Sequence, residues 1–176
     1  MKKRNPLKYL LSRRSAVIAL FGAGAACAVR EEKAMANNDP DPTDVLDYDD
    51  WQLTDEQWRE RLSAEAYAVL RREGTERPGT SHLLNEKRDG IFACAGCGLE
   101  LFDASTKYES GTGWPSFFDV IPGNVGTKTD RKLFLPRTEY HCGRCGGHQG
   151  HVFEDGPQPT GLRYCNNGVA LTFIPA

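Results

Sequence analysis

From Gly74 to the C-terminus, apolar residues occur in short runs separated by glycine, proline, aspartate and asparagine. Runs of this length, bounded by turn residues, predict β-strands. The last run alternates cleanly, with Val169, Leu171 and Phe173 on one face. Many short strands without intervening helices indicate a mainly β fold, in which antiparallel sheets form a small twisted sandwich or open barrel. The predicted strands are Gly90–Cys94, Glu100–Phe102, Ser116–Ile121, Lys132–Pro136, Thr138–Cys142, Val152–Phe153, Arg163–Asn166 and Val169–Phe173.

Two short N-terminal helices are predicted before these strands. Thr54 and Gln57 have the spacing of a capping box, which begins a helix by satisfying its first backbone donors. Ser63 can cap a second helix that ends at Gly74. Apolar residues recur on one face of this second helix, which should therefore pack on the core; they are Ala66, Val69 and Leu70.

The first 36 residues have the organisation of an export signal. Residues 1–14 carry six basic residues and no acidic one, and the uncharged stretch 15–29 is shorter than the roughly 20 apolar residues of a membrane span. Ala34-Met35-Ala36 is the expected cleavage site, and Ser12-Arg13-Arg14 resembles the twin-arginine signal for folded cargo. We therefore expect export to the bacterial periplasm, with no stable membrane span in the mature chain. An ordinary secretory signal, acylation at Cys27, and an uncleaved anchor or disordered tail are alternatives.

The expected mature chain is acidic. Removal of residues 1–36 takes away eight of the 22 basic residues and two of the 24 acidic ones, which leaves a formal charge of −8. Residues 37–50 hold six aspartates and few apolar residues, so we predict a solvated linker before a domain over residues 51–176. Because phosphate binding needs a basic surface, nucleic acid is not an expected partner. We expect a monomer.

Two Cys-x-x-Cys-Gly motifs hold four of the six cysteines: Cys94, Cys97, Cys142 and Cys145. Each motif can present two thiolates to one ion, and the glycine after it allows the tight turn that this requires. Since 44 residues separate the two motifs, one zinc ion would join distant parts of the chain. Four thiolates leave no open coordination position, so such a zinc is structural. Two disulfides or a redox-active dithiol are the alternative.

The remaining cysteine of the domain, Cys165, has polar neighbours. If its segment is extended, Arg163, Cys165 and Asn167 share one face, and a guanidinium beside a thiol favours the reactive thiolate. Asn167-Gly168 also has the composition of a hairpin turn, which would move Asn167 off that face. A buried structural cysteine is the simpler interpretation.

Two further elements could line a site around that cysteine. His148 and His151 follow the second cysteine motif and could be metal ligands, solvated groups or general acids. With four cysteines available to the metal, the ligand interpretation is the weakest. The glycine-flanked Trp114-Pro115 pair and Phe117 could form either core or the wall of a pocket. Together, an indole, titratable histidines and a thiolate indicate a pocket for a small soft group.

In this order, these residues resemble the B-type methionine sulfoxide reductases, which act on the R epimer of methionine sulfoxide. The resemblance implies that Cys165 attacks the sulfoxide sulfur, giving methionine and a sulfenic acid on Cys165. It also implies roles for the neighbours: His148 and His151 position and protonate the oxygen, Trp114 and Phe117 bind the substrate, and Asn167 and Arg163 complete the site. The resemblance runs from about Trp51 to Phe173 and includes both cysteine motifs, Arg72–Pro78, Gly111–Phe117, Gly147–Phe153, Asp155–Pro157 and Pro159–Cys165.

One position departs from the family. Many members carry a resolving cysteine where this chain has Thr112. After cleavage at Ala36, no thiol is left to pair with Cys165 once four cysteines bind zinc. An external thiol reductant, such as a thioredoxin-like protein, is therefore expected to reduce the sulfenic acid. A zinc-ribbon interaction module and a thiol-disulfide oxidoreductase are the rival interpretations. The first leaves Trp114, His151 and Cys165 without a role, and one tightly held zinc would exclude the second.

Overall fold

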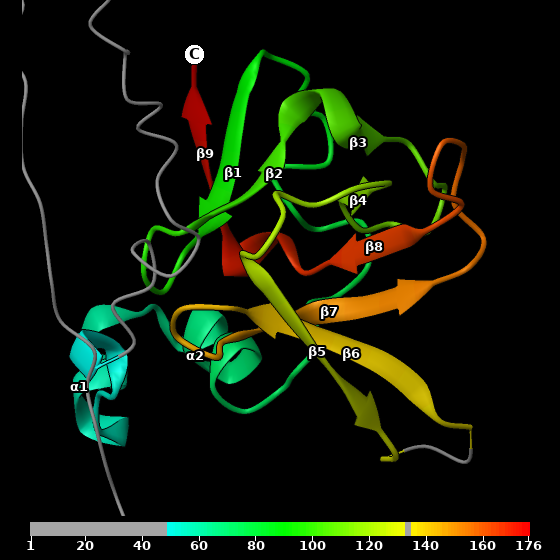
Figure 1. Cartoon of the computed structure of the whole chain (residues 1–176). Helices are drawn as coiled ribbons and strands as arrows, with labels where there is room; N and C mark the ends of the chain where they lie inside the picture. Colours follow the sequence, from blue (N-terminus) through cyan, green and yellow to red (C-terminus); the bar gives the residue numbers. More distant parts are fainter. Residues whose placement is uncertain (1–48, 133–134) are drawn as a thin grey trace, which may run out of the picture. The chain divides into compact units, whose positions relative to one another are not determined.

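The computed structural model describes residues 49–132 and 135–176 (Figure 1). The predicted export signal, Cys27 and most of the acidic linker lie outside the described residues, so these predictions stay predictions. Asp49 and Asp50, at the end of that linker, begin a short 3-10 helix, η1 (Asp49–Trp51). Among the described residues, no helix is long and apolar enough to cross a membrane.

Two short helices, α1 (Asp55–Arg61) and α2 (Ala64–Leu70), precede the sheets. The predicted capping box is confirmed: the Gln57 amide donates to Thr54 Oγ1 at 3.3 Å, and the Thr54 amide donates to Gln57 Oε1 at 2.7 Å. Ser63 Oγ caps α2 by accepting from the Ala66 amide at 3.1 Å. The predicted apolar face of α2 is buried, as expected; its members are Ala66, Val69 and Leu70.

The second helix ends earlier than predicted. It stops at Leu70, and the chain then turns through Glu73, whose φ of 53° lies in the left-handed region. Gly74 serves a different purpose, because a Cβ there would lie 2.7 Å from the Ala68 carbonyl oxygen. This close turn delivers Glu76 to the larger sheet, where its amide donates to Asn167 Oδ1 at 2.8 Å.

All strands of the described residues belong to two antiparallel sheets, which confirms the mainly β prediction (Figure 1). The smaller sheet, ordered β2-β1-β9, consists of β1 (Gly90–Cys94), β2 (Glu100–Asp103) and β9 (Leu171–Pro175). The larger sheet is ordered β3-β4-β8-β7-β6-β5. Its strands are β3 (Lys107–Tyr108), β4 (Ser116–Phe117), β5 (Val125–Asp130), β6 (Arg137–Cys142), β7 (His148–Phe153) and β8 (Arg163–Asn166).

Four predicted strands differ from the structure. The predicted Val152–Phe153 is only the end of β7, which begins at His148. Only the first two residues of Ser116–Ile121 are a strand, and the described residues of Lys132–Pro136 lie in none. Residues 168–170 form a 3-10 helix, η3 (Gly168–Ala170), so the final strand begins at Leu171 and not at Val169. The unpredicted β5 is largely polar because it is the edge strand of its sheet, and two-residue β3 is too short to show a pattern.

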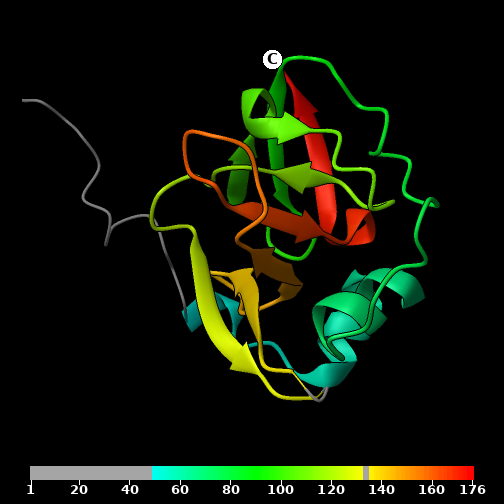
Figure 2. The ribbon, with the colours of Figure 1, turned by 90° about the vertical axis from the view of Figure 1, so that its right-hand side faces the viewer.

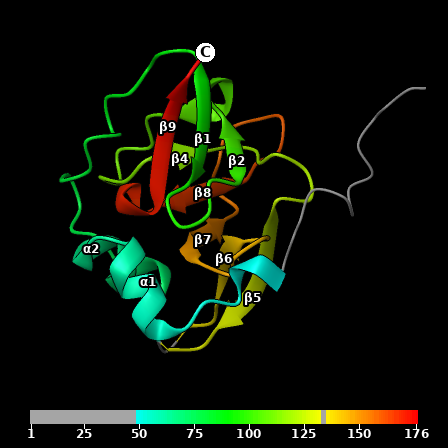
Figure 3. The same cartoon turned by 90° about the vertical axis from the view of Figure 1, so that its left-hand side faces the viewer.

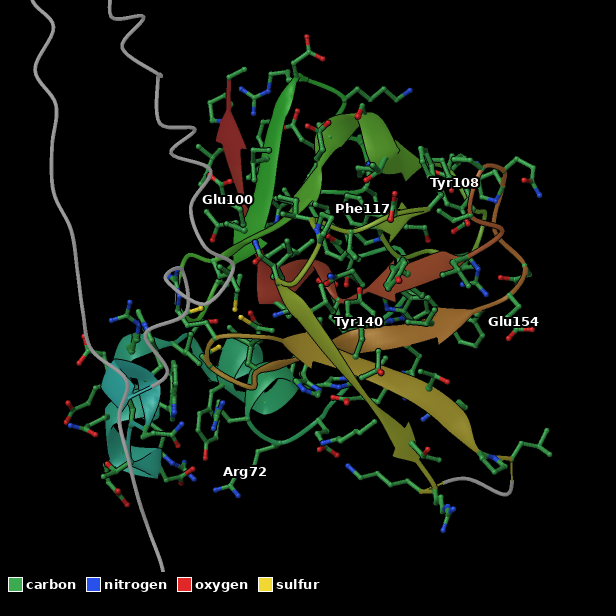
Figure 4. All side chains as sticks on the ribbon, viewed as in Figure 1. Arg72, Glu100, Tyr108, Phe117, Tyr140 and Glu154 are labelled. Carbon is green, nitrogen blue, oxygen red and sulfur yellow. The ribbon has the colours of Figure 1, made fainter. Side chains whose placement is uncertain are left out.

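Aromatic side chains join the two sheets. Phe102 of β2 stacks on Phe117 of β4 with ring centroids 4.0 Å apart, and Phe92 of β1 meets Phe117 edge to face at 5.0 Å. Tyr140 and Tyr164 of the larger sheet pack edge to face at 5.3 Å and continue the cluster. Phe117 and Tyr140 lie in the interior of the domain (Figure 4). Figures 2 and 3 show the smaller sheet at one end and the helices at the other.

None of the described residues is a methionine, since the chain's two methionines are Met1 and Met35. The core is filled by aromatic rings, by leucine, valine and alanine, and by the cysteines of the two Cys-x-x-Cys motifs. Methionine, whose flexible side chain often fills irregular gaps in protein cores, is therefore absent from this part of the chain.

Candidate functional site

The four cysteines of the two motifs come together as one cluster. Their sulfur atoms all lie within 4.8 Å of one another, with Cys94 Sγ 3.7 Å from Cys145 Sγ and Cys97 Sγ 3.5 Å from Cys142 Sγ. Four thiolates around a tetrahedral zinc are about 3.8 Å apart, given a Zn–S bond of about 2.3 Å. A disulfide would need about 2.05 Å. The donor set and its spacing therefore fit one zinc ion, and the disulfide alternative does not fit.

The two motifs have the same backbone construction. In each, the amide of the first cysteine donates to the carbonyl five residues on, and the glycine amide donates back to the carbonyl of that cysteine. Gly98 and Gly146 make this turn with φ of 76° and 67°, as their place in the motif predicts. Hydrogen bonding among the four sulfur atoms lowers the pKa of Cys97 and Cys145 and raises that of Cys94 and Cys142, so without a metal the negative charge falls on two of the four sulfurs.

The cluster also bridges the two sheets. Cys94 ends β1 of the smaller sheet and Cys142 ends β6 of the larger one. Gln149, fully buried in β7, donates to Cys94 Sγ at 3.4 Å and so orients that ligand. A metal ion here would cross-link the sheets and leave no coordination position for a reactant.

The register of the larger sheet sets five polar residues in one row. Ser116 pairs with Cys165, Cys165 with His151, His151 with Glu139, and Glu139 with Lys128. Directly paired residues of antiparallel strands project from the same face, with Cβ atoms about 5 Å apart. The sheet therefore places Cys165 and His151 next to each other on one face, although 13 residues of chain lie between them.

A pocket of about 130 Å³ opens over this row. Four of the predicted site residues lie on its wall: Trp114, His151, Cys165 and Asn167. The other lining residues are Thr75, Arg137, Gly150, Phe153 and Asn166. Gly150 keeps β7 close to β8, because a Cβ on it would lie 1.9 Å from the Cys165 carbonyl oxygen.

Opposing influences act on the Cys165 thiol. Burial raises its pKa above the usual value, while the Arg163 charge and a hydrogen bond from Thr112 act in the opposite direction. Arg163 is itself held by Asp155, with two bonds of 2.8 and 2.9 Å, and its guanidinium lies 4.3 Å above the Phe153 ring. The predicted effect of Arg163 is present, but burial outweighs it. Cys165 is thus a neutral thiol at rest.

His151 is the histidine that faces the pocket. Its Nε2 lies 2.8 Å from Asp130 Oδ2, and the same oxygen accepts from Arg137 Nη2 at 2.7 Å. Hydrogen bonds from the Lys132 amide, His151 and Arg137 hold the pKa of Asp130 well below its usual range, so it is a carboxylate. Burial lowers the pKa of His151, and the bond to Asp130 opposes that effect without cancelling it.

His148 does not reach the pocket. It is 3% exposed and its Nδ1 lies 2.7 Å from Oε1 of Glu139, which is also buried. Burial alone would raise the pKa of Glu139, but hydrogen bonds from His141 and His148 outweigh it and hold that pKa at about 2. The ring of His148 lies 5.5 Å from that of His151. His148 therefore packs against His151 on the side away from the pocket. It does not line the pocket, so its predicted contact with substrate is wrong.

Asn167 and Trp114 are fixed by one residue that the sequence did not single out, Glu76. The Glu76 carbonyl accepts from Trp114 Nε1 at 2.9 Å, its amide donates to Asn167 Oδ1, and its carboxylate accepts from the Gly168 amide at 2.7 Å. Asn167 Nδ2 also donates to the Gln149 carbonyl at 2.9 Å. Asn167 lies on the pocket wall but both of its amide atoms bind backbone, so it positions the wall.

Phe117 does not contribute to the pocket. Its side chain is 0% exposed and its ring lies between those of Phe92 and Phe102, so the predicted substrate contact is wrong. Conversely, sequence reasoning missed Asp130, Arg137 and Glu139. The last two share a face of β6 with His141, and this period-two run of ionisable residues in a buried strand is the signal that could have found them.

Replacement of Asp130 by asparagine should lower the pKa of His151 further. The variant keeps the size of the side chain but removes the negative charge that partly offsets burial. In an NMR titration of the histidines, the His151 midpoint should move to lower pH. Asp89→Asn, at an exposed position before β1, is the matched control and should leave the His151 midpoint in place. An unchanged His151 midpoint in Asp130→Asn would show that the carboxylate does not act on the imidazole.

Comparisons with known proteins cover this same region. Residues 62–175 match the family model described as the SelR domain. The chain is 54% identical over 121 residues to a peptide methionine sulfoxide reductase MsrB of Methanosarcina barkeri, covering 68% of this chain and 85% of that protein. It is 52% identical over 124 residues to the MsrB of Leifsonia xyli, covering 69% and 89%. A chloroplastic peptide methionine sulfoxide reductase B1 of Arabidopsis thaliana is 49% identical over 120 residues, covering 68% and 59%.

Proposed function

Because the chain belongs to the SelR-domain family of B-type peptide methionine sulfoxide reductases, it is an oxidoreductase of that activity, and we propose that Cys165 performs the reduction on the R epimer. The observation that carries this proposal is the pairing of Cys165 with His151 across two strands, on the wall of one pocket. A pocket of about 130 Å³ suits a sulfoxide and its methyl group.

The protonation states of Cys165 and His151 support a route for the proton. Burial raises the pKa of the thiol and lowers that of the imidazole, so both are neutral before substrate binds. As Cys165 attacks the sulfoxide sulfur, a bond forms between the two sulfur atoms, and the thiol proton passes through His151 to the sulfoxide oxygen. The protonated oxygen then moves to Cys165 Sγ as a hydroxyl group, and the sulfoxide S–O bond and the new S–S bond both break. Arg163 and Thr112 stabilise the thiolate as it forms.

The net step transfers one oxygen atom. Thiol and methionine sulfoxide become sulfenic acid and methionine, with the cysteine sulfur oxidised and the methionine sulfur reduced. The thiol proton ends on the sulfenic acid oxygen. The Trp114 indole is held by the hydrogen bond from its Nε1 to the Glu76 carbonyl, and it offers the methyl group an apolar wall of the pocket. Contact of the methyl group with this wall and of the oxygen with His151 would distinguish the two epimers.

Among the described residues, no cysteine outside the metal cluster accompanies Cys165. Four of the five described cysteines form that cluster, and the side chains that contact Cys165 include Thr112 and Arg163, neither of which carries a thiol. We propose that a thioredoxin-like protein or another thiol compound reduces the sulfenic acid directly. When bound, a zinc ion at the cluster supplies a cross-link between the sheets and no chemistry at the pocket.

An assay with each epimer separately tests the proposed function. The enzyme should convert peptide methionine R-sulfoxide to methionine with at least one of several thiol donors, such as dithiothreitol and a thioredoxin, and should leave the S epimer intact. The S epimer should be rejected because exchanging oxygen and methyl group would turn the oxygen away from His151. Conversion of S in preference to R, or failure on R with every donor, would overturn the proposal.

A further inference from the structure

A second and larger hollow adjoins the Cys165 pocket. It has a volume of about 900 Å³ and shares Arg137 and Phe153 with that pocket. We call it the apolar groove and define it by Leu135, Pro136, Val152, Phe153 and Leu162. It lies where β6 begins, β7 ends and β8 begins, on the right of Figure 1, beside Glu154 as labelled in Figure 4.

The groove exposes apolar surface that the fold does not use. Leu135 is 78% exposed, although most large hydrophobic side chains of the described residues are buried or half-buried. The other exposed one, Ile174 at 46%, lies in β9 of the smaller sheet. Exposed apolar surface beside a reactive pocket is typical of a binding site rather than of a scaffold.

We propose that the apolar groove binds the polypeptide on one side of the oxidised methionine, and that it selects segments with a large apolar side chain within two residues of the sulfoxide. This inference rests on the proposed function. When the sulfoxide lies against Cys165, the methionine side chain leads back to its main chain at the mouth of the pocket. Since Arg137 and Phe153 belong to both hollows, the main chain leaves the pocket over the groove.

The dimensions and charges of the junction agree with this occupant. An extended peptide advances about 3.3 Å per residue, so the next two residues lie over the groove. The charge of Arg137 is balanced by Asp130 at 2.7 Å, and an apolar side chain can therefore pass it without displacing an unpaired cation. Glu154 lies on the rim and would repel acidic neighbours of the methionine.

The test compares three substrates on four proteins. The substrates are a peptide with methionine R-sulfoxide flanked by leucine, the same peptide flanked by aspartate, and blocked methionine R-sulfoxide alone. For the wild type, kcat/KM should be about tenfold higher with leucine than with aspartate, the size expected for one apolar side chain in a pocket. Leu135→Asn and Leu162→Asn remove apolar contact without adding a charge, so they should remove most of that preference and leave the blocked amino acid unaffected. Ile174→Asn, the matched control on the other sheet, should alter none of the three.

The outcomes separate the groove from the chemistry. Equal kcat/KM for both peptides in the wild type, or equal effects of Leu135→Asn and Ile174→Asn, would overturn the groove proposal. If the wild type does not reduce the blocked amino acid, that result would instead count against the proposed function. Fluorescence anisotropy of the two peptides bound to the Cys165→Ser protein needs no turnover. There the leucine peptide should bind more tightly, and equal binding would again overturn the proposal.

Discussion

The Cys165→Ser variant is expected to lose sulfoxide reduction entirely, a fall of at least about 10³-fold in kcat. A serine hydroxyl is far less acidic than a thiol, so neither His151 nor Arg163 can generate the nucleophile, and an alcohol oxygen cannot accept the sulfoxide oxygen. The fold should be unchanged, because serine is close to cysteine in size at this half-buried position and the metal cluster is built from other cysteines. Thermal unfolding and zinc content should equal those of the wild type. Retained activity would mean that another residue is the nucleophile.

Mass spectrometry after one turnover identifies what forms on Cys165. Mixed with methionine R-sulfoxide peptide and no reductant, the wild-type chain should gain one oxygen, about 16 Da, and Cys165→Ser should gain nothing. Loss of two hydrogens from the wild type would reveal an internal disulfide and contradict regeneration from outside. Thr112→Cys is the informative control. Its new thiol would occupy the position that contacts Cys165, so this variant should lose about 2 Da in place of gaining an oxygen.

Loss of the metal should unfold the domain. Structural zinc contributes on the order of 10 kcal/mol in small zinc-binding peptides, as much as the whole stability of a typical domain. Here it would also join β1 to β6, and without it four buried thiols would face one another with no ion between them. Metal analysis should find one zinc per chain. Cys94→Ser, or prolonged treatment with a strong chelator, should abolish the cooperative thermal transition seen by circular dichroism.

A milder variant tests the cluster without unfolding the domain. Gln149→Leu removes only the hydrogen bond to Cys94 Sγ and keeps the buried volume similar, so it should lower zinc affinity and Tm while the domain stays folded. Cys165→Ser should lower neither. If stripped protein keeps the Tm of the zinc-loaded form, the cluster does not hold the sheets together.

Local signals in the sequence predicted much of this fold. Thr54 with Gln57, Ser63, and the glycines after each cysteine pair specify their own backbone geometry through bonds to near neighbours, and all are confirmed. The edge strand β5 was missed because an edge needs no apolar pattern, and the described residues of Lys132–Pro136, which are Lys132, Leu135 and Pro136, lie in no strand. Sheet pairing depends on partners far along the chain, which a local pattern cannot show.

The site shows the same division. Cys165, His151 and Trp114 lie in motifs, and the structure brings them to one pocket. His148 could not be distinguished from His151 by sequence, since its burial depends on Glu139 in the neighbouring strand. Asp130 is 21 residues from His151 and becomes its partner only through the packing of β5, β6 and β7. Phe117 belonged to a motif for its part in the core and not for contact with substrate.

The absence of methionine from the described residues suits a protein that works among oxidants. Oxidation turns a methionine in a core from an apolar side chain into a polar one and loosens the packing around it. A repair catalyst built with such residues would lose its own packing under the conditions that create its substrate, and would compete with its clients for repair. The interior between the sheets contains no thioether for an oxidant to attack, so methionine oxidation cannot disrupt its packing.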